Sequence, residues 1–268
     1  MPDLWLLIPL LLATGAFAGI LSGLLGVGGG IVIVPFLFHL FASYGLPAGL
    51  AMPLAVGTSL STIVLTSLIS ARSHHAKGGV DSALVKAWIF PVLVGVVVGS
   101  MTPYLIDGAA VKTSFGVMLV LVSFHILASS HWDLTLFQRL PSRPAQFLLA
   151  AIVGGLSGML GIGGGTFMVP LLTLFSVPIH RAVSTASVFG LIISVPATLV
   201  YIAIGLSVSG LPPMTTGYVN WAVFLVLVPM TMLLAPVGVR LAYRLNVVQL
   251  KRAFAVFLCL VGLKMALV

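Results

Sequence analysis

Long apolar stretches separated by short polar connections recur along the whole chain. Crossing roughly 30 Å of hydrocarbon takes about 20 helical residues, and most of these stretches reach that length. A membrane β-barrel would instead show short segments of alternating apolar and polar residues. We predict an all-α integral membrane protein with about ten transmembrane or half-spanning helices. The expected helices cover residues 4–24, 31–43, 49–71, 83–105, 111–129, 145–161, 166–177, 182–205, 219–239 and 250–267.

Two of the expected helices, 31–43 and 166–177, are too short to span the membrane comfortably. Each follows a run of three glycines, and a glycine in a helix costs about 1 kcal/mol relative to alanine. Pro35 and Pro170 then lack the amide proton that a helix interior needs. We therefore predict a chain break at both places. Since proline suits the first turn of a helix, we expect the half-helices to begin near these prolines, after a short extended stretch.

Composition supports the membrane interpretation, because 60% of residues are hydrophobic and 6% are charged. That leaves too little polar surface to cover a soluble globule of this size. The net charge of +8 does not indicate nucleic-acid binding, since the basic residues are scattered in short connections. All four acidic residues are aspartates in or next to loops. A carboxylate proton relay at membrane depth is therefore disfavoured.

The basic residues are unevenly distributed among the connections, and this predicts the topology. Positively charged connections face the cytoplasm. Connections 44–48, 106–110 and 206–218 lack this enrichment and should face outward, as should both termini. The basic residues near the inward connections are Arg72, Lys77, Lys86, Arg139, Arg143, Arg181, Arg240, Arg244, Lys251 and Arg252.

The chain contains an internal repeat. The stretch from Gly19 to Leu37 returns 135 residues later, from Gly154 to Leu172, with twelve of nineteen positions identical. We divide the chain into a first repeat, 1–133, and a second, 134–268. Each repeat contains five expected helices, so an odd number of crossings makes the second enter from the opposite side. Inverted repeats of this kind are typical of secondary transporters.

The glycine runs are the predicted substrate site. Exposed amide groups and the start of a half-helix attract negative charge. Two copies related by a pseudo-two-fold axis would converge on one central anion, and nearby hydroxyls would add donors. The alternative for the glycines at four-residue spacing, Gly15, Gly19 and Gly23, is close helix packing. The predicted substrate-binding residues are Ser22, Gly28, Gly29, Gly30, Thr58, Ser59, Ser157, Gly163, Gly164, Gly165 and Thr185.

Few other side chains are candidates for a functional role. Arg181 borders a short inward loop and is a candidate gating residue. His74 and His75 are expected to form a solvated loop pair. We find no histidine with ligand partners at metal spacing, and predict no metal and no cofactor. An enzyme would need a nucleophile with a base, or a metal triad, at membrane depth, and the sequence offers neither.

The two copies of Leu-Gly-x-Gly-Gly-Gly-x-x-x-Val-Pro, with Ala-Val-Gly-Thr-Ser at 55–59, resemble the sulfite exporter TauE/SafE family of membrane transporters. The resemblance extends over both halves. It implies export of sulfite or of small organosulfonates such as sulfoacetate from the bacterial cytoplasm. The second copy departs from the first in having Ser184 where the first has Gly57.

Together these features predict a multi-pass protein of the bacterial inner membrane that exports a small anion by alternating access. The alternatives are a channel-like anion conductor and an uptake carrier for another small oxyanion. The expected partners are the anion and the lipid bilayer, with a homodimer possible and no nucleic acid. Without a carboxylate at membrane depth, the membrane potential is the simplest driving force, worth about 2.3 kcal/mol per charge per 100 mV.

Overall fold

The computed structural model describes residues 4–131, 137, 140–244 and 247–267, and helices dominate them. The helices are α1 (Leu4–Leu25), α2 (Gly30–Ser43), α3 (Ala48–His75), α4 (Ser82–Ser100), α5 (Thr102–Leu105), α6 (Gly108–His131), α7 (Arg143–Leu160), α8 (Gly165–Leu174), α9 (Ile179–Gly205), α10 (Trp221–Ala242) and α11 (Val247–Leu267). Two short strands, β1 (Thr215–Thr216) and β2 (Val219–Asn220), form a hairpin before α10. The all-α prediction is confirmed.

The apolar stretches account for the helices, because a chain in hydrocarbon must satisfy its own backbone groups. Within the described residues, seven helices are long and apolar enough to cross a membrane. One prediction, a single helix over 83–105, is wrong. Pro103 has no amide proton to bond the carbonyl of Gly99, which accepts a hydrogen bond from the Thr102 hydroxyl at 2.7 Å instead. The segment therefore breaks into α4 and α5.

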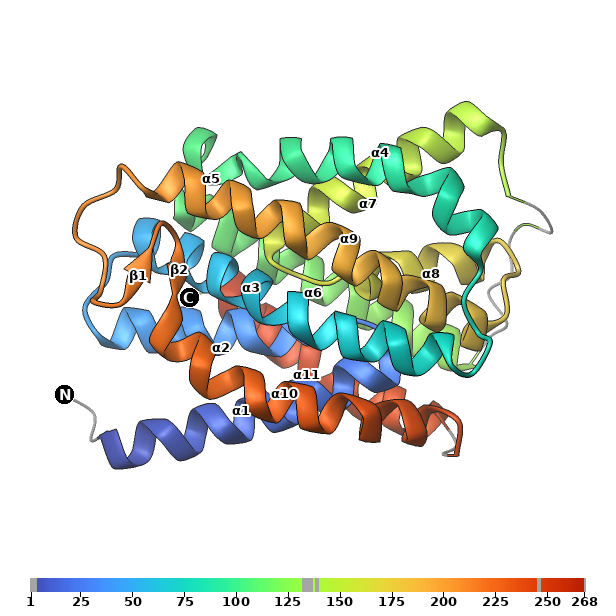
Figure 1. The fold of residues 1–268 in the computed structure, drawn as a ribbon, viewed down its shortest axis with the longest axis horizontal. Helices are drawn as coiled ribbons and strands as arrows, with labels where there is room; N and C mark the ends of the chain where they lie inside the picture. The colour runs from blue at the N-terminus through green and yellow to red at the C-terminus, as the bar shows by residue number, and fades with distance from the viewer. Residues whose placement is uncertain (1–3, 132–136, 138–139, 245–246, 268) are drawn as a thin grey trace.

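The connections gather at two ends of the molecule (Figure 1). At one end Gly108 packs against Ala48, and Gly57 packs against Tyr218. At the other end Lys77 lies over the Tyr243 ring, 4.8 Å from its centroid. These are the two groups of connections that the basic residues predicted. We name the end with residues 76–81 and 175–178 the inner end, and the end with residues 44–47 and 206–218 the outer end.

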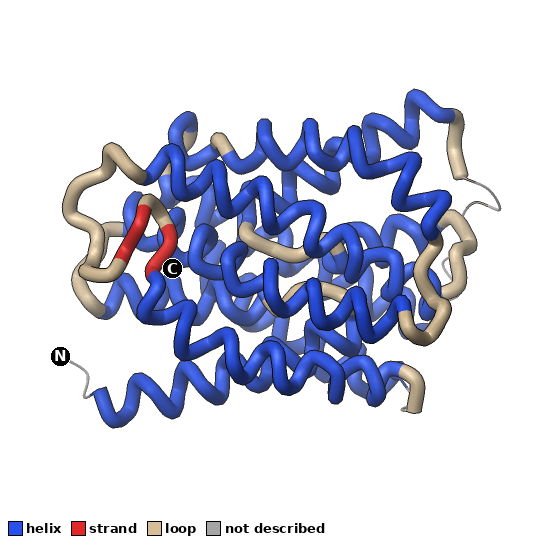
Figure 2. The backbone as a smooth tube through the Cα atoms, in the orientation of Figure 1, coloured by secondary structure: helices blue, strands red, loops and turns tan. Residues whose placement is uncertain are grey.

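The helices pack in pairs, whose backbones are drawn in Figure 2. Glycines lie at the contacts between several of these pairs. Helices α1 and α10 run parallel, with Gly15 against the Leu227 carbonyl and Gly19 against that of Thr231. Helices α4 and α7 also run parallel, with Gly99 against Gly155. Close packing therefore accounts for the four-spaced glycines of α1. Helices α6 and α11 form a further pair.

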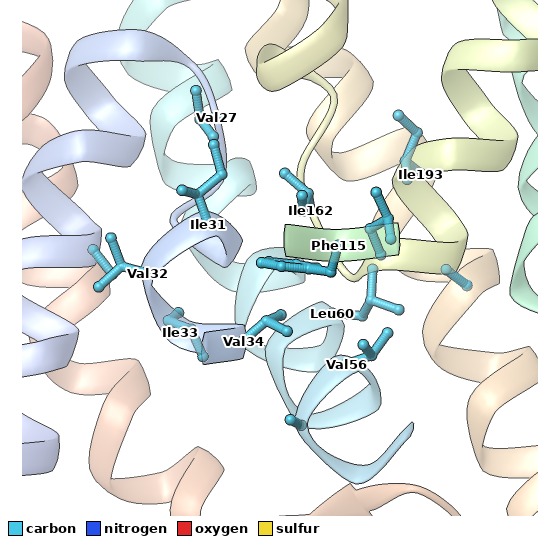
Figure 3. Close-up of a cluster of buried hydrophobic side chains, with 14 of the residues drawn as sticks. Val27, Ile31, Val32, Ile33, Val34, Val56, Leu60, Phe115, Ile162 and Ile193 are labelled. Carbon is cyan, nitrogen blue, oxygen red and sulfur yellow. The ribbon is translucent and has the colours of Figure 1, made fainter. Parts of the chain in front are cut away.

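Helices α3 and α9 form the centre of the protein and run antiparallel. Ser67 of α3 lies beside Gly190 of α9, while His74, nearer the end of α3, bonds to Ser184, nearer the start of α9. Apolar side chains surround the middle of this pair (Figure 3). They include Leu60 and Phe115, both fully buried.

Candidate functional site

Two glycine loops meet at the centre of the protein. Residues 26–29 join α1 to α2, and residues 161–164 join α7 to α8. A Cβ atom built at Gly28 would lie 3.2 Å from the Cα atom of Gly163, and one built at Gly163 would lie 3.0 Å from that of Gly28. Their neighbours Val27 and Ile162 lie over the apolar core in Figure 3. The loops therefore touch backbone to backbone.

The predicted chain breaks are confirmed, but the predicted starts of the half-helices are wrong. The helices begin at Gly30 and Gly165, and the prolines lie inside them at the sixth position. A proline there removes a single intrahelical bond, from Pro35 to the carbonyl of Ile31, whereas an extended stretch would leave several buried groups unpaired. The first loop is a turn with φ of +77° at Gly28 and +82° at Gly29.

The remaining glycines of the two runs also permit close approach. Side chains at Gly30 or Gly165 would collide with backbone of the opposite loop, namely Gly161 and Gly26 respectively. Gly29 faces the Ala18 carbonyl, and Gly164 faces α9 at Phe189. All six predicted glycines are buried.

Ser22 and Ser157 occupy equivalent places in the last turns of α1 and α7, just before the two loops. Both side chains are fully buried, and neither hydroxyl has a hydrogen-bond partner among the described residues. The same holds for Thr166 in the first turn of α8. Buried hydroxyls without partners are rare, because each costs about 1 to 3 kcal/mol. Three such groups therefore flank the meeting loops.

Ser59 is also brought to the loops. Its hydroxyl donates a hydrogen bond of 3.0 Å to the carbonyl of Gly161, across 102 residues of sequence. Ser59 thus ties α3 to the second glycine loop, and its hydroxyl proton is already used.

Thr58 and Thr185 lie apart from each other, toward opposite ends. The Thr58 hydroxyl accepts a 3.0 Å hydrogen bond from the amide of Asn220, and the Thr185 hydroxyl accepts one of the same length from the amide of Asp81. Asp81 and Asn220 are the N-cap residues of α4 and α10. The two threonines therefore make the same contact in each half of the chain, at the entry to a helix.

Arg181 lies at the inner end, where its guanidinium is 3.0 Å from the carboxylate of Asp81. The Arg181 side chain is 56% exposed and that of Asp81 is 22% exposed. This ion pair joins the start of α9 to the start of α4. The guanidinium is therefore accessible from the surface at the inner end.

The prediction that His74 lies in a solvated loop is wrong. Helix α3 extends to His75, and His74 is 1% exposed. Its Nε2 lies 3.0 Å from the carbonyl of Gly23 and its Nδ1 lies 3.2 Å from the hydroxyl of Ser184. A carbonyl can only accept, so Nε2 carries the hydrogen. His74 thus bridges α1, α3 and α9.

Tyr201, near the outer end of α9, makes a contact that corresponds to the one between His74 and Gly23. Its hydroxyl donates a 3.0 Å hydrogen bond to the carbonyl of Met159, in the last turn of α7. Each of the two central helices is thus bonded, through a large buried side chain, to the helix that precedes a glycine loop. No local pattern marks either contact, because the partners are 51 and 42 residues apart.

Comparison with known proteins places these features in a family. The model of the sulfite exporter TauE/SafE family matches residues 11–265. A probable membrane transporter protein of Haemophilus influenzae is 30% identical over 259 residues, covering 96% of this chain and 97% of that protein. One of Methanocaldococcus jannaschii is 30% identical over 270 residues, covering 98% and 96%. No solved structure matches the chain. The chain is a multi-pass membrane transporter that belongs to the sulfite exporter TauE/SafE family.

Proposed function

We propose that this transporter exports a small anion, sulfite or an organosulfonate such as sulfoacetate, across the bacterial inner membrane by alternating access. The observation that carries the proposal is the pair of unpartnered hydroxyls, Ser22 and Ser157, beside the two meeting glycine loops. Hydroxyl and amide donors suit an oxyanion, which accepts several hydrogen bonds and donates few. The family's description and the sulfonate class agree with this chemistry.

The half-helices add to the attraction. Helices α2 and α8 both begin at the glycine loops, and a helix N-terminus carries roughly half a positive charge with free amide groups. Partial charges and hydroxyls bind an anion less tightly than a full ion pair would. Such a site can release its substrate on the other side, as transport requires.

The packing of the helices supports the two inverted repeats, 1–133 and 134–268, although the boundary between them lies outside the described residues. If α1 corresponds to α7 and α4 corresponds to α10, the two-fold relation maps the packed pair α1–α10 onto the packed pair α7–α4. The corresponding helices α3 and α9 run antiparallel, as inversion requires. Exchange of conformations between the halves is the usual basis of alternating access in such proteins.

The test is flux in proteoliposomes, with sulfite and sulfoacetate as substrates and with Ser22→Ala, Ser157→Ala and the double variant. A hydrogen bond to a charged group contributes about 1.5 to 3 kcal/mol, so each variant should weaken apparent affinity by roughly 10- to 100-fold. Ser123→Ala is the matched control, because Ser123 is equally buried but its hydroxyl donates to the Val120 carbonyl. Unchanged affinity in the double variant would refute the site.

A second measurement separates carrier from channel. Flux per protein that saturates with substrate, and exchange of labelled for unlabelled anion across the membrane, are expected of alternating access. Flux that rises without saturation would instead support a channel-like conductor.

A further inference from the structure

The face of α3 that packs against α9 changes character along its length. Toward the inner end it carries Ser67, Ser70 and His74, at a spacing that places them on one helix face. The facing stretch of α9 carries Ser184 and Ser187. All five side chains are polar and buried. We call this part of the interface the inner seam.

Toward the outer end the same face of α3 is apolar. Ile63, Leu60 and Val56 continue the spacing of Ser67 and Ser70, and all three are fully buried. Figure 3 shows Leu60 and Val56 among the apolar side chains below the glycine loops. This face of α3 is therefore polar toward the inner end and apolar toward the outer end, where Ile63 and Val56 lie against the glycine loops.

The inner seam contains buried hydroxyls that lack hydrogen-bond partners. Within the described residues, Ser67 and Ser70 have no hydrogen-bond partner, and neither does Ser22 on α1. A serine in a membrane helix normally bonds a carbonyl of its own helix, as Ser187 does with Ser184. Three unpartnered hydroxyls on two neighbouring helices are not needed for packing, since alanine would fit without the desolvation cost.

His74 closes the inner seam at its mouth. It bonds Gly23, next to Ser22, and Ser184 across the seam. The ring of Tyr243, the C-cap residue of α10, lies 6.0 Å from the His74 ring and 5.3 Å from that of His180. Charged groups at this end include Lys77, which lies over Tyr243, and the pair of Asp81 with Arg181. Arg72 and Arg240 lie in the last turns of α3 and α10.

We propose that the inner seam is the path of the anion between the inner end and the glycine loops, with Ser22, Ser67 and Ser70 as its hydrogen-bond donors and His74 as its gate. The inference rests on the proposed function and names residues for one half of the transport cycle. Breaking the contacts of His74 with Gly23 and Ser184 separates α3 from α1 and α9 at the mouth. An oxyanion entering there meets Ser70, then Ser67, one turn deeper in α3.

The test uses cysteines, because the chain has a single native one, Cys259. In a Cys259→Ala background, Ser67→Cys and Ser70→Cys are compared with the matched apolar positions Leu60→Cys and Val56→Cys. The probe is 2-sulfonatoethyl methanethiosulfonate, a small sulfonate that reacts with thiols, added to vesicles of known orientation. Size-exclusion profiles and full labelling in denaturant establish that each variant is folded and carries its thiol.

The inner seam cysteines should react from the inner side at least about tenfold faster than the cysteines at 60 and 56. Sulfoacetate, which does not react with the probe as sulfite would, should slow the reaction at the seam. Adding His74→Ala should accelerate the reaction at Ser70→Cys. Reaction at 60 and 56 as fast as at 67 and 70, or reaction of 67 and 70 from the outer side only, would overturn the proposal. Labelling without anion flux would leave the seam accessible but refute the proposed function, whereas flux with inert seam cysteines would refute only the path.

Discussion

Replacing Gly28 by alanine tests whether contact between the glycine loops stabilises the fold. Gly28 has φ of +77°, and a residue with a Cβ atom loses about 1 to 2 kcal/mol in this region. The new Cβ would also lie 2.8 Å from Cγ2 of Ile63 and 3.2 Å from the Cα atom of Gly163. Overpacking of a buried site costs about 1 to 3 kcal/mol more. We expect a total loss of about 2 to 5 kcal/mol in the free energy of unfolding.

Gly78→Ala is the matched control. Gly78 has φ of +70°, close to that of Gly28, but a Cβ atom there meets nothing within 4 Å. Only the backbone cost of about 1 to 2 kcal/mol should remain. The difference between the two variants therefore measures the cost of placing a Cβ atom between Ile63 and the second glycine loop, which we expect to be about 1 to 3 kcal/mol.

The assay is denaturant unfolding in mixed micelles, with both variants and the parent protein measured in the same detergent and lipid. Anion flux is measured on the same preparations in proteoliposomes. Equal losses of stability in Gly28→Ala and Gly78→Ala would show that the loops do not press together. Full flux in a folded Gly28→Ala protein would further show that the meeting point tolerates a side chain, contrary to a role in binding.

Three other substitutions test contacts at the two ends. Arg181→Ala should change stability by less than about 1 kcal/mol, because the pair with Asp81 is exposed, but should slow anion uptake from the inner side at low salt in flux assays. Thr185→Val should lower the free energy of unfolding by about 1 to 3 kcal/mol, since it leaves the amide of Asp81 without its acceptor. Tyr201→Phe removes the hydrogen bond to Met159 and should increase thiol labelling of a cysteine at residue 60 from the outer side. Unchanged labelling would show that this hydrogen bond does not close the outer end.

Much of the architecture was predictable from local patterns. The apolar stretches predicted the helices, since hydrocarbon leaves the backbone no partner but itself. The basic residues predicted which connections share an end, and Lys77 and Arg181 do lie at the same end. The glycine runs predicted the breaks after α1 and α7, because three consecutive glycines weaken a helix whatever surrounds them.

Other features depend on partners that no local pattern reveals. His74 looks like a loop residue beside Arg72 and Lys77, yet α3 continues past it and the Gly23 carbonyl receives its hydrogen bond. Thr58 and its counterpart Thr185 were predicted to bind substrate because they recur, but the sequence does not show that the Thr58 hydroxyl accepts a hydrogen bond from an amide 162 residues away. The unpartnered state of Ser67 is likewise invisible in the sequence, because most serines in membrane helices bond their own backbone.

The two ends share one architecture but differ in charge, and this difference predicts how each end responds to salt. The N-cap of α4 is Asp81, held by Thr185 and paired with Arg181, whereas the N-cap of α10 is the neutral Asn220, held by Thr58. At the inner end the pair of Asp81 with Arg181 is charged and partly exposed, so the opening of that end should depend on the salt concentration. Under the proposed export, an anion from the cytoplasm would meet the inner end first, where Lys77 and Arg181 carry positive charge.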